Sequence, residues 1–359
     1  MTENPAFPWQ PGTATAIGSL PGTDPLEAAR LIATELEDFP HLPELPARGP
    51  GADMIGRTAA LLIDIPVETT TGGWRLSPER PGRDARRARS LLAQDLDALE
   101  EAFDGYTGLL KLQLAGPWTL AAALEQPHSL KVALADPGAV ADLASSLAEG
   151  GAAHVAEVAR RIPGATLVVQ YDEPGLPAVI DGAVPSPSGL TRVRAVEEEV
   201  LRDRLRLVLS ASGRYTVVHC CGQPFPFQLA RGSGASAVSF DLALIRAEGW
   251  DQLAETAEAG LGLFAGVSVA PDLASRPPGR RAAGPPPAPG DTPAAMARSV
   301  SGAWRRMGLP PSDCAPQVVI TPACGLAGAS PQGAAEALKH VAKAARILPE
   351  IMEERSLWS

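Results

Sequence analysis

The chain has 359 residues and a formal net charge of −10, and 45% of its residues are hydrophobic. This length fits one large domain or two smaller ones, and it is enough to bury a substantial core. The acidic balance argues against a nucleic-acid-binding surface, which needs clustered Lys and Arg, and it favours small-molecule partners.

The sequence shows no membrane-spanning or export signal. No apolar run reaches the roughly 18 residues that a membrane helix needs. Residues 1–12, MTENPAFPWQPG, lack the basic and apolar regions of a signal peptide. We therefore expect a cytoplasmic protein, in which the four cysteines are thiols, catalytic groups or metal ligands rather than disulfides.

Apolar runs of strand length recur along the chain, and each ends at Gly, Pro or a carboxylate. They are ATAIGSLPG (14–22), LLKLQLAGP (109–117), ATLVVQYDEPG (165–175), YTVVHCCG (215–222), ASAVSFDL (235–242), LGLFAGVSVAPD (261–272) and QVVITPACG (317–325).

Long amphipathic patterns between these runs predict helices. They start at Asp24, Asp84, Asp136 and Arg192. Asp is a favoured N-cap residue, and Asp24 with Glu27 has the spacing of a capping box.

Strands that alternate with helices predict a parallel sheet covered by helices. The simplest such fold is a single-domain (β/α)₈ TIM barrel over residues 13–359, after an N-terminal arm at 1–12. A doubly wound sheet is the alternative, although IGSLPG lacks the glycine spacing of a dinucleotide-binding loop. Residues 276–293, RPPGRRAAGPPPAPGDTP, predict a surface loop or linker that could also serve as a lid.

A histidine and two adjacent cysteines end the run YTVVHCCG. Because side chains alternate along a strand, His219 and Cys221 should share one face, while Cys220 points away and packs as a small apolar residue. An H-x-C pair alone is weak evidence, because a lone strand histidine is usually a satisfied core residue.

Cys324 also follows an apolar strand, and a barrel would bring it to the same rim as His219 and Cys221. Two thiols and an imidazole suit zinc, with Asp241 as the fourth candidate ligand. Cys314 is expected in a loop at the opposite end of the barrel, with a structural or incidental role.

The sequence resembles the catalytic barrel of cobalamin-independent methionine synthase, within the wider group that includes uroporphyrinogen decarboxylase and the corrinoid-linked thiol methyltransferases. The resemblance covers nearly the whole chain. It rests on TAIGSLPGT (15–23), LAGPWTL (114–120), VQYDEPGL (169–176), HCCG (219–222), VSFD (238–241) and PACGL (322–326), which occur in the order of the family.

The resemblance implies a zinc ion held by His219, Cys221, Cys324 and Asp241, where Asp241 stands in place of the usual Glu. It also implies that zinc binds the thiol of homocysteine. Ile17, Ser19 and Glu173 would contact this substrate. Asp172 would receive its ammonium group and act as a catalytic carboxylate. Without the resemblance, an equally good interpretation is that Asp172 and Glu173 belong to a charged loop that caps the next element.

Two departures from the family pattern keep alternatives open. AGVSVAPD, from Ala265, lacks the family's catalytic histidine, and Arg48 stands where a substrate-binding Glu is expected, with Glu44 as a substitute.

Three functions follow from the sequence. The first is zinc-dependent methyl transfer to homocysteine from methyltetrahydrofolate or a methylcorrinoid protein. The second is methyl transfer to another small thiol from a methylcorrinoid protein. The third is a non-methyltransferase barrel. It would be either a relative of uroporphyrinogen decarboxylase, which would need a cationic cleft and no metal, or a binding protein with a vestigial site.

Overall fold

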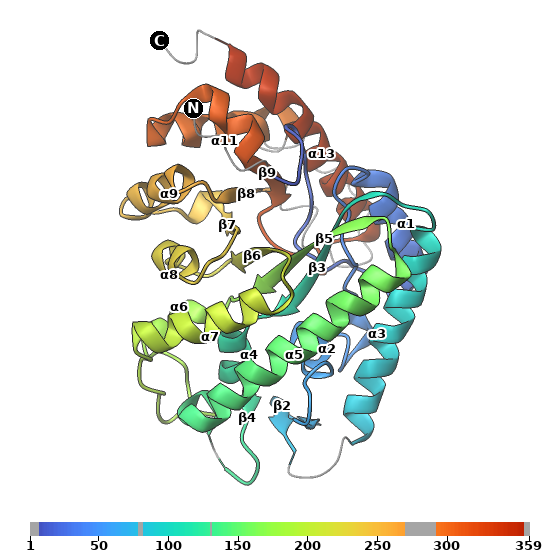
Figure 1. Ribbon diagram of the computed structural model, residues 1–359, viewed down its shortest axis with the longest axis vertical. Helices are drawn as coiled ribbons and strands as arrows, with labels where there is room; N and C mark the ends of the chain where they lie inside the picture. Colours follow the sequence, from blue (N-terminus) through green and yellow to red (C-terminus); the bar gives the residue numbers. More distant parts are fainter. Residues whose placement is uncertain (1–6, 78–81, 130, 270–291, 355–359) are drawn as a thin grey trace, which may run out of the picture.

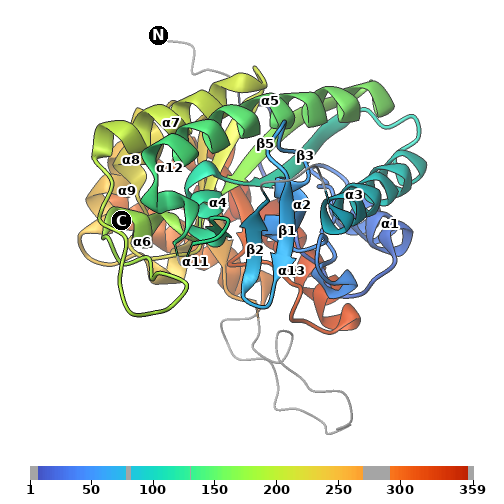
Figure 2. The same ribbon diagram turned by 90° about the horizontal axis from the view of Figure 1, so that it is seen from below.

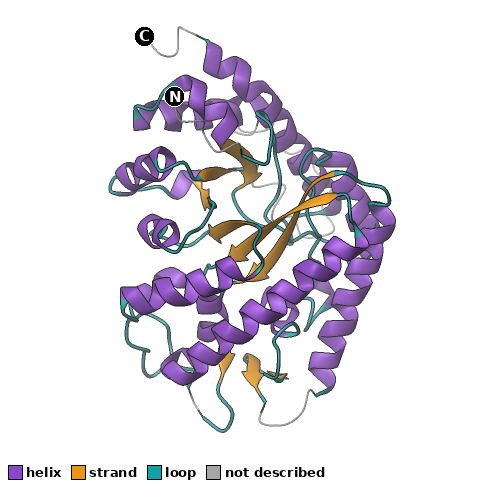
Figure 3. Ribbon diagram, in the orientation of Figure 1, coloured by secondary structure: helices purple, strands orange, loops and turns teal. Residues whose placement is uncertain are grey.

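The computed structural model describes residues 7–77, 82–129, 131–269 and 292–354 (Figure 1). Among these residues, six parallel strands form a curled sheet in which they pair in the order of the chain. Helices cover the outside of this sheet, as Figure 3 shows. The strands are β3 (Gly108–Ala115), β5 (Ala165–Asp172), β6 (Tyr215–Cys220), β7 (Ala237–Asp241), β8 (Gly262–Val267) and β9 (Val318–Pro322).

The first predicted strand, residues 14–22, is not a strand of this sheet. Gly and Pro interrupt the run, and such residues weaken a ladder of hydrogen bonds. Two extended segments instead lie between the sheet edges β9 and β3 and make isolated bridges. These bridges join Ala14 to Ile320, Ser19 to Glu44 and His41 to Lys111. The sheet is thus a half-barrel that is compatible with a TIM-barrel-like fold, while closure by eight strands stays a prediction.

The described helices alternate with the strands. Within the described residues, no helix is both long and apolar enough to cross a membrane. The longer helices are α1 (Pro25–Glu35), α3 (Arg83–Ala102), α5 (Pro137–Arg161), α7 (Glu198–Ala211), α9 (Gly249–Glu258), α11 (Pro293–Met307) and α13 (Pro331–Glu353). The shorter ones are α2 (Met54–Ala59), α4 (Pro117–Ala123), α6 (Leu176–Ile180), α8 (Phe227–Gly232) and α12 (Pro311–Gln317), with 3₁₀ turns η1 (Pro46–Arg48), η2 (Ala133–Ala135) and η3 (Leu242–Leu244).

Two of the predicted helix starts are confirmed. Asp24 caps α1, where its carboxylate accepts a hydrogen bond from the backbone N–H of Leu26 at 2.9 Å. Asp136 caps α5 by accepting from the N–H of Gly138 at 2.9 Å. In both cases a carboxylate satisfies backbone donors that a helix leaves unpaired.

The helix predicted from Asp84 is present as α3 and begins one residue earlier, although Asp84 is not its cap, whereas the start predicted at Arg192 is wrong. Asp84 is the second residue of α3, and its carboxylate binds the backbone N–H and the hydroxyl of Thr69, at 3.0 and 2.6 Å. The helix predicted from Arg192 begins only at Glu198.

Cys314, predicted in a loop, lies buried in α12.

A second, small sheet was not predicted from the sequence. Strands β1 (Val67–Thr70) and β2 (Gly73–Leu76) form an antiparallel hairpin, and β2 pairs with β4 (Leu124–Glu125). The hairpin stands beside α3 in Figure 2. The contact between Asp84 and Thr69 joins α3 to this hairpin.

Apolar side chains fill the interior of the half-barrel at the amino ends of its strands. One side chain from each strand of the sheet contributes, and Trp9 and Phe39 close the layer. The indole ring of Trp9 packs edge-on against Phe264, with centroids 5.2 Å apart, and its N–H donates to the carbonyl of Pro316. Trp9, which lies in the predicted N-terminal arm, is therefore part of the core.

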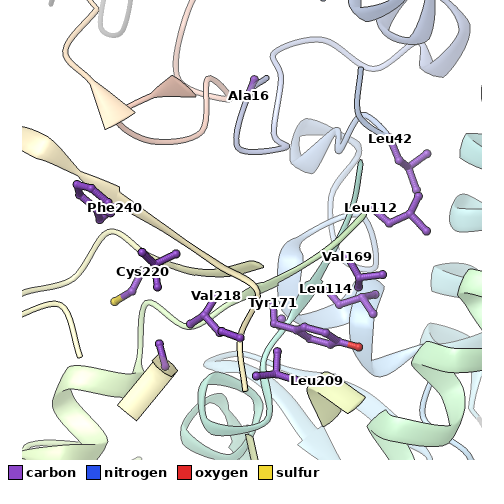
Figure 4. Close-up of a cluster of buried hydrophobic side chains, with 14 of the residues drawn as sticks. Ala16, Leu42, Leu112, Leu114, Val169, Tyr171, Leu209, Val218, Cys220 and Phe240 are labelled. Carbon is purple, nitrogen blue, oxygen red and sulfur yellow. The ribbon is translucent and has the colours of Figure 1, made fainter. Parts of the chain in front are cut away.

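The outward faces of the strands pack against the helices, and Cys220 belongs to this layer. Cys220 is 1% exposed and lies in one cluster with Val218, Phe240 and Leu209 of α7 (Figure 4). The predicted alternation of the two adjacent cysteines is confirmed on this side, because Cys220 packs among apolar side chains.

Most of the predicted Pro-rich loop, residues 276–291, lies outside the described residues. Its last two predicted positions form the start of a helix. Thr292 caps α11 through a hydrogen bond from the N–H of Ala295 at 3.2 Å, and Pro293 is the first helical residue.

Candidate functional site

A cavity of about 280 Å³ lies at the carboxyl ends of β5, β6 and β9. We call it the thiol cavity because Cys221 and Cys324 line it. Glu44, named from the sequence as a substitute for Arg48, also lines this thiol cavity. Glu173 and Asp241 are not among its described lining residues. The cavity brings together six of the eight predicted site residues, namely Ile17, Ser19, Asp172, His219, Cys221 and Cys324.

The two cysteines of the cavity contact each other. Cys221 donates an S–H hydrogen bond to the sulfur of Cys324, which lowers the pKa of Cys324 to about 6. The same hydrogen bond, followed by burial, raises the pKa of Cys221. The two thiols therefore shift each other's pKa in opposite directions.

His219 reaches the cavity from β6 and is fixed by one hydrogen bond. Its Nδ1 lies 2.9 Å from the hydroxyl of Ser239, and its Nε2 has no hydrogen bond with a described residue. Burial, with the nearby charge of Lys111, lowers the pKa of His219 to about 3. The imidazole is therefore neutral, which is the form that binds metal ions.

Asp241 is not among the described lining residues of the cavity, although its charge acts on Cys324. Its carboxylate caps η3 by accepting a hydrogen bond from the N–H of Ala243 at 2.9 Å, and burial raises its pKa. Over the described ranges, no three or more His, Cys, Asp or Glu side chains are arranged to hold a metal ion. The kinds of donor nevertheless fit zinc, because two thiols and a neutral imidazole line one cavity.

Two buried carboxylates, Asp172 and Glu44, face the cavity beside a buried lysine. Lys111 is 0% exposed, and its ammonium donates to the carbonyl of Ile17 at 2.9 Å and to the side-chain oxygen of Gln170 at 2.8 Å. Gln170 donates in turn to Asp172 at 2.7 Å. Burial raises the pKa of both carboxyls and lowers that of Lys111 to about 7.

Arg48 is occupied away from the cavity. Its guanidinium pairs with Asp95 and donates to the side chain of Gln94 at 2.8 Å. Arg57 bridges the same Asp95, at 2.6 Å, to Glu44, at 3.6 Å. Glu44 is thus the residue of this region that lines the thiol cavity, and Arg48 belongs to a supporting ion-pair network.

Ser19 closely approaches Gly325 in the loop after β9. Its carbonyl accepts a hydrogen bond from the N–H of Leu326 at 2.8 Å. A Cβ atom at Gly325 would lie 2.1 Å from the hydroxyl oxygen of Ser19, so a side chain there would force this hydroxyl to turn away.

Glu173, predicted as a substrate contact, instead supports the short helix α4. One carboxylate oxygen accepts from the N–H of Trp118 at 3.0 Å, and the other accepts from the N–H and hydroxyl of Thr119, both at 2.7 Å. Glu173 is 0% exposed, and burial raises its pKa to about 7. The alternative reading from the sequence, a capping carboxylate, fits this geometry, although the capped helix precedes Glu173 in the chain.

Replacing Glu173 with alanine should destabilise the protein, because three buried donors lose their acceptor. We expect a loss of about 2–4 kcal/mol in the free energy of unfolding, measured by urea denaturation. The exposed Glu199 of α7 provides the matched control, Glu199→Ala, which should leave the denaturation midpoint nearly unchanged. Equal midpoints for the two variants would show that Glu173 does not support α4.

The sequence analysis missed Lys111 and Gln170, although a signal was present. Both are polar residues inside apolar strands, and they fall on the alternating positions that face the barrel interior. A buried polar residue in such a strand needs a partner. Its presence therefore indicates a polar layer between the cavity and the apolar layer at the amino ends of the strands.

Comparisons with known proteins show a shared fold but no family. No protein-family model matches the sequence, and no curated protein matches it. The structure resembles that of a B12-independent methionine synthase from Shewanella sp. W3-18-1 in complex with selenomethionine, with a TM-score of 0.61, 15% identity, and coverage of 95% of this chain and 98% of that one.

A second similar structure is a glycoside hydrolase family 20 β-N-acetylglucosaminidase, with a TM-score of 0.42, 13% identity, and coverage of 94% of this chain and 70% of that one. A TM-score of 0.42 is too low to support a conclusion about the fold or function of this chain. The comparison that carries weight shows that this chain shares its overall fold with a B12-independent methionine synthase.

Proposed function

We propose that this protein is a zinc-dependent methyltransferase that converts homocysteine to methionine. The observation that carries the proposal is the arrangement of the thiol cavity, which has two thiols and a neutral imidazole together with two carboxylates, Asp172 and Glu44. A small amino acid with a thiol side chain matches both sets of groups. The cavity volume of about 280 Å³ suits a molecule of this size.

Cys221, Cys324 and His219 would hold the zinc ion, which deprotonates a thiol that binds to it. Catalytic zinc sites commonly have three protein ligands and one open position. Asp241 accepts a hydrogen bond from η3 and does not line the cavity, so a zinc ion held by these three residues would leave a position for the substrate thiol. Asp172 and Glu44 receive the substrate's ammonium group, and Lys111 with Gln170 keeps Asp172 in place.

The sulfur lone pair then forms the S–CH₃ bond while the bond between the methyl group and its carrier breaks. A methylfolate must receive a proton on its leaving nitrogen. When the donor is a methylcorrinoid, the corrinoid leaves in the Co(I) state and needs no proton. The sequence AGVSVAPD has no histidine to deliver a proton, and this favours a methylcorrinoid protein as the donor. The same observation keeps transfer to another small thiol as the second candidate.

The decarboxylase alternative fits the cavity less well. Its substrate carries several carboxylates and needs a cationic cleft. No described residue that lines the thiol cavity is Lys or Arg, and the cavity volume of about 280 Å³ is small for a tetrapyrrole. The pair of carboxylates in the wall would repel a polycarboxylate.

We infer in addition that the extended segments 13–20 and 40–45 take the places of two strands and close an eight-stranded barrel. Backbone hydrogen bonds support this inference at each junction. The N–H of Thr15 donates to Ile320 of β9 at 3.1 Å, and the N–H of Leu42 donates to Lys111 of β3 at 2.9 Å.

The proposal predicts one zinc ion per chain and methyl transfer to homocysteine. Zinc is measured by elemental analysis after purification without chelators, and turnover is measured with homocysteine or other small thiols against methyltetrahydrofolate and methylcobalamin. Asp241→Ala should retain zinc, in contrast to His219→Ala. Absence of zinc would overturn the proposal, and turnover only with another thiol would replace homocysteine by that acceptor.

A further inference from the structure

A second cavity, of about 610 Å³, is lined by residues of α4, of α7 and of the segment that precedes α7 in the chain. Its described lining residues come from segments 131–140 and 186–204 and from Trp118, and none of them lines the thiol cavity. The cavity is larger than the proposed substrate site, and the proposed function assigns it no role.

The floor of this second cavity is apolar. Trp118 is 0% exposed, and Val132, Leu134 and Val140 are also buried. The indole N–H of Trp118 donates to the carbonyl of Leu201 at 3.1 Å, so its polar atom is already satisfied. Such a floor favours the apolar or aromatic body of a ligand.

The rim of the cavity is cationic. Lys131, Arg192, Arg194 and Arg204 line it, and none of the four forms an ion pair with a described residue. Glu197 is the carboxylate among its described lining residues. In a chain with a net charge of −10, this concentration of unpaired positive charge indicates a site for negative charge.

The loop that carries the two rim arginines Arg192 and Arg194 is held in place by backbone contacts. The N–H of Val193 donates to Val184 at 2.9 Å. At the base of the loop, Gly182 has a φ of +61°, and a Cβ atom there would lie 2.7 Å from the nitrogen of Ala195. The backbone of this part of the rim is therefore formed before a ligand arrives, which lowers the entropic cost of binding.

We propose that the second cavity binds an amphipathic polyanion, namely a small molecule with an apolar or aromatic body and two or more phosphate or carboxylate groups. The body would lie on the floor formed around Trp118, and the anionic groups would pair with the rim cations. The backbone N–H of Trp118 donates to Glu173, which follows Asp172 in the chain. A ligand in this cavity would thus lie one helix away from the proposed substrate site, but its binding does not depend on methyl transfer.

Isothermal titration calorimetry on the full chain tests the proposal. ATP without divalent cations and benzene-1,3,5-tricarboxylate serve as amphipathic anions, and inorganic pyrophosphate lacks the apolar body. We expect both amphipathic anions to bind once per chain, with the tighter one identifying the preferred anionic group. Pyrophosphate should bind about tenfold more weakly or worse.

The variant Arg192→Ser with Arg194→Ser should weaken binding by about tenfold or more, because charge-assisted hydrogen bonds are lost. Its matched control is Arg214→Ser with Arg246→Ser, which removes two exposed arginines that lie outside the cavity. Unchanged binding in the control supports the site. The proposal is overturned if neither amphipathic anion binds, if both double variants weaken binding equally, or if pyrophosphate binds as tightly as ATP.

Discussion

Replacing Cys221 with serine is expected to abolish tight zinc binding and methyl transfer, whereas Cys220→Ser should keep both. A hydroxyl is a far poorer zinc ligand than a thiolate, and a tetrahedral site does not readily lose a member. Cys221 lines the thiol cavity beside Cys324, while Cys220 is buried in the outer core. Zinc stoichiometry and turnover of the purified variants are the measurements.

The cost of changing Cys220 should instead appear as lower stability. We expect about 1–3 kcal/mol for Cys220→Ser if the buried hydroxyl finds no partner, and less for Cys220→Ala. These adjacent residues are controls for each other, because only their orientation differs. Zinc loss in Cys220→Ser together with zinc retention in Cys221→Ser would shift the ligand assignment by one residue.

Replacing Lys111 with methionine should be among the most destabilising single changes outside the apolar core. Methionine fills most of the same space, but the carboxyls of Asp172 and Glu44 lose one nearby buried cation, and Gln170 loses a donor. Removing one partner from a buried charged cluster typically costs about 3–5 kcal/mol. Urea denaturation should show a midpoint shift of this size, and a weaker apparent affinity for the thiol substrate should accompany it.

The control for this variant is Lys339→Met on α13. Lys339 has a side chain that is 60% exposed, and its ammonium lies 3.5 Å from the carboxylate of Glu35. Exposed ion pairs contribute little to stability, so the control should unfold at nearly the wild-type urea concentration. If Lys111→Met also unfolds there, the buried polar cluster does not depend on this cation.

The sequence by itself determined features that depend on near neighbours along the chain. The alternation of side chains on a strand was enough to separate the buried Cys220 from Cys221, which lines the cavity. The caps at Asp24 and Asp136 were predictable because a capping carboxylate binds backbone donors only two or three residues away. The positions of six sheet strands followed from their apolar runs in the same way.

Only the tertiary structure decided which partner each of these polar residues binds. Glu173 and Asp241 stand at strand ends like the cavity residues, yet one binds α4 and the other η3. Lys111 looks like an anomaly in an apolar run until Gln170 and Asp172 lie beside it. Each outcome depends on donors that are distant in sequence or on loop geometry. A buried polar group takes the partner that folding brings within hydrogen-bond distance, and residue order alone does not specify that partner.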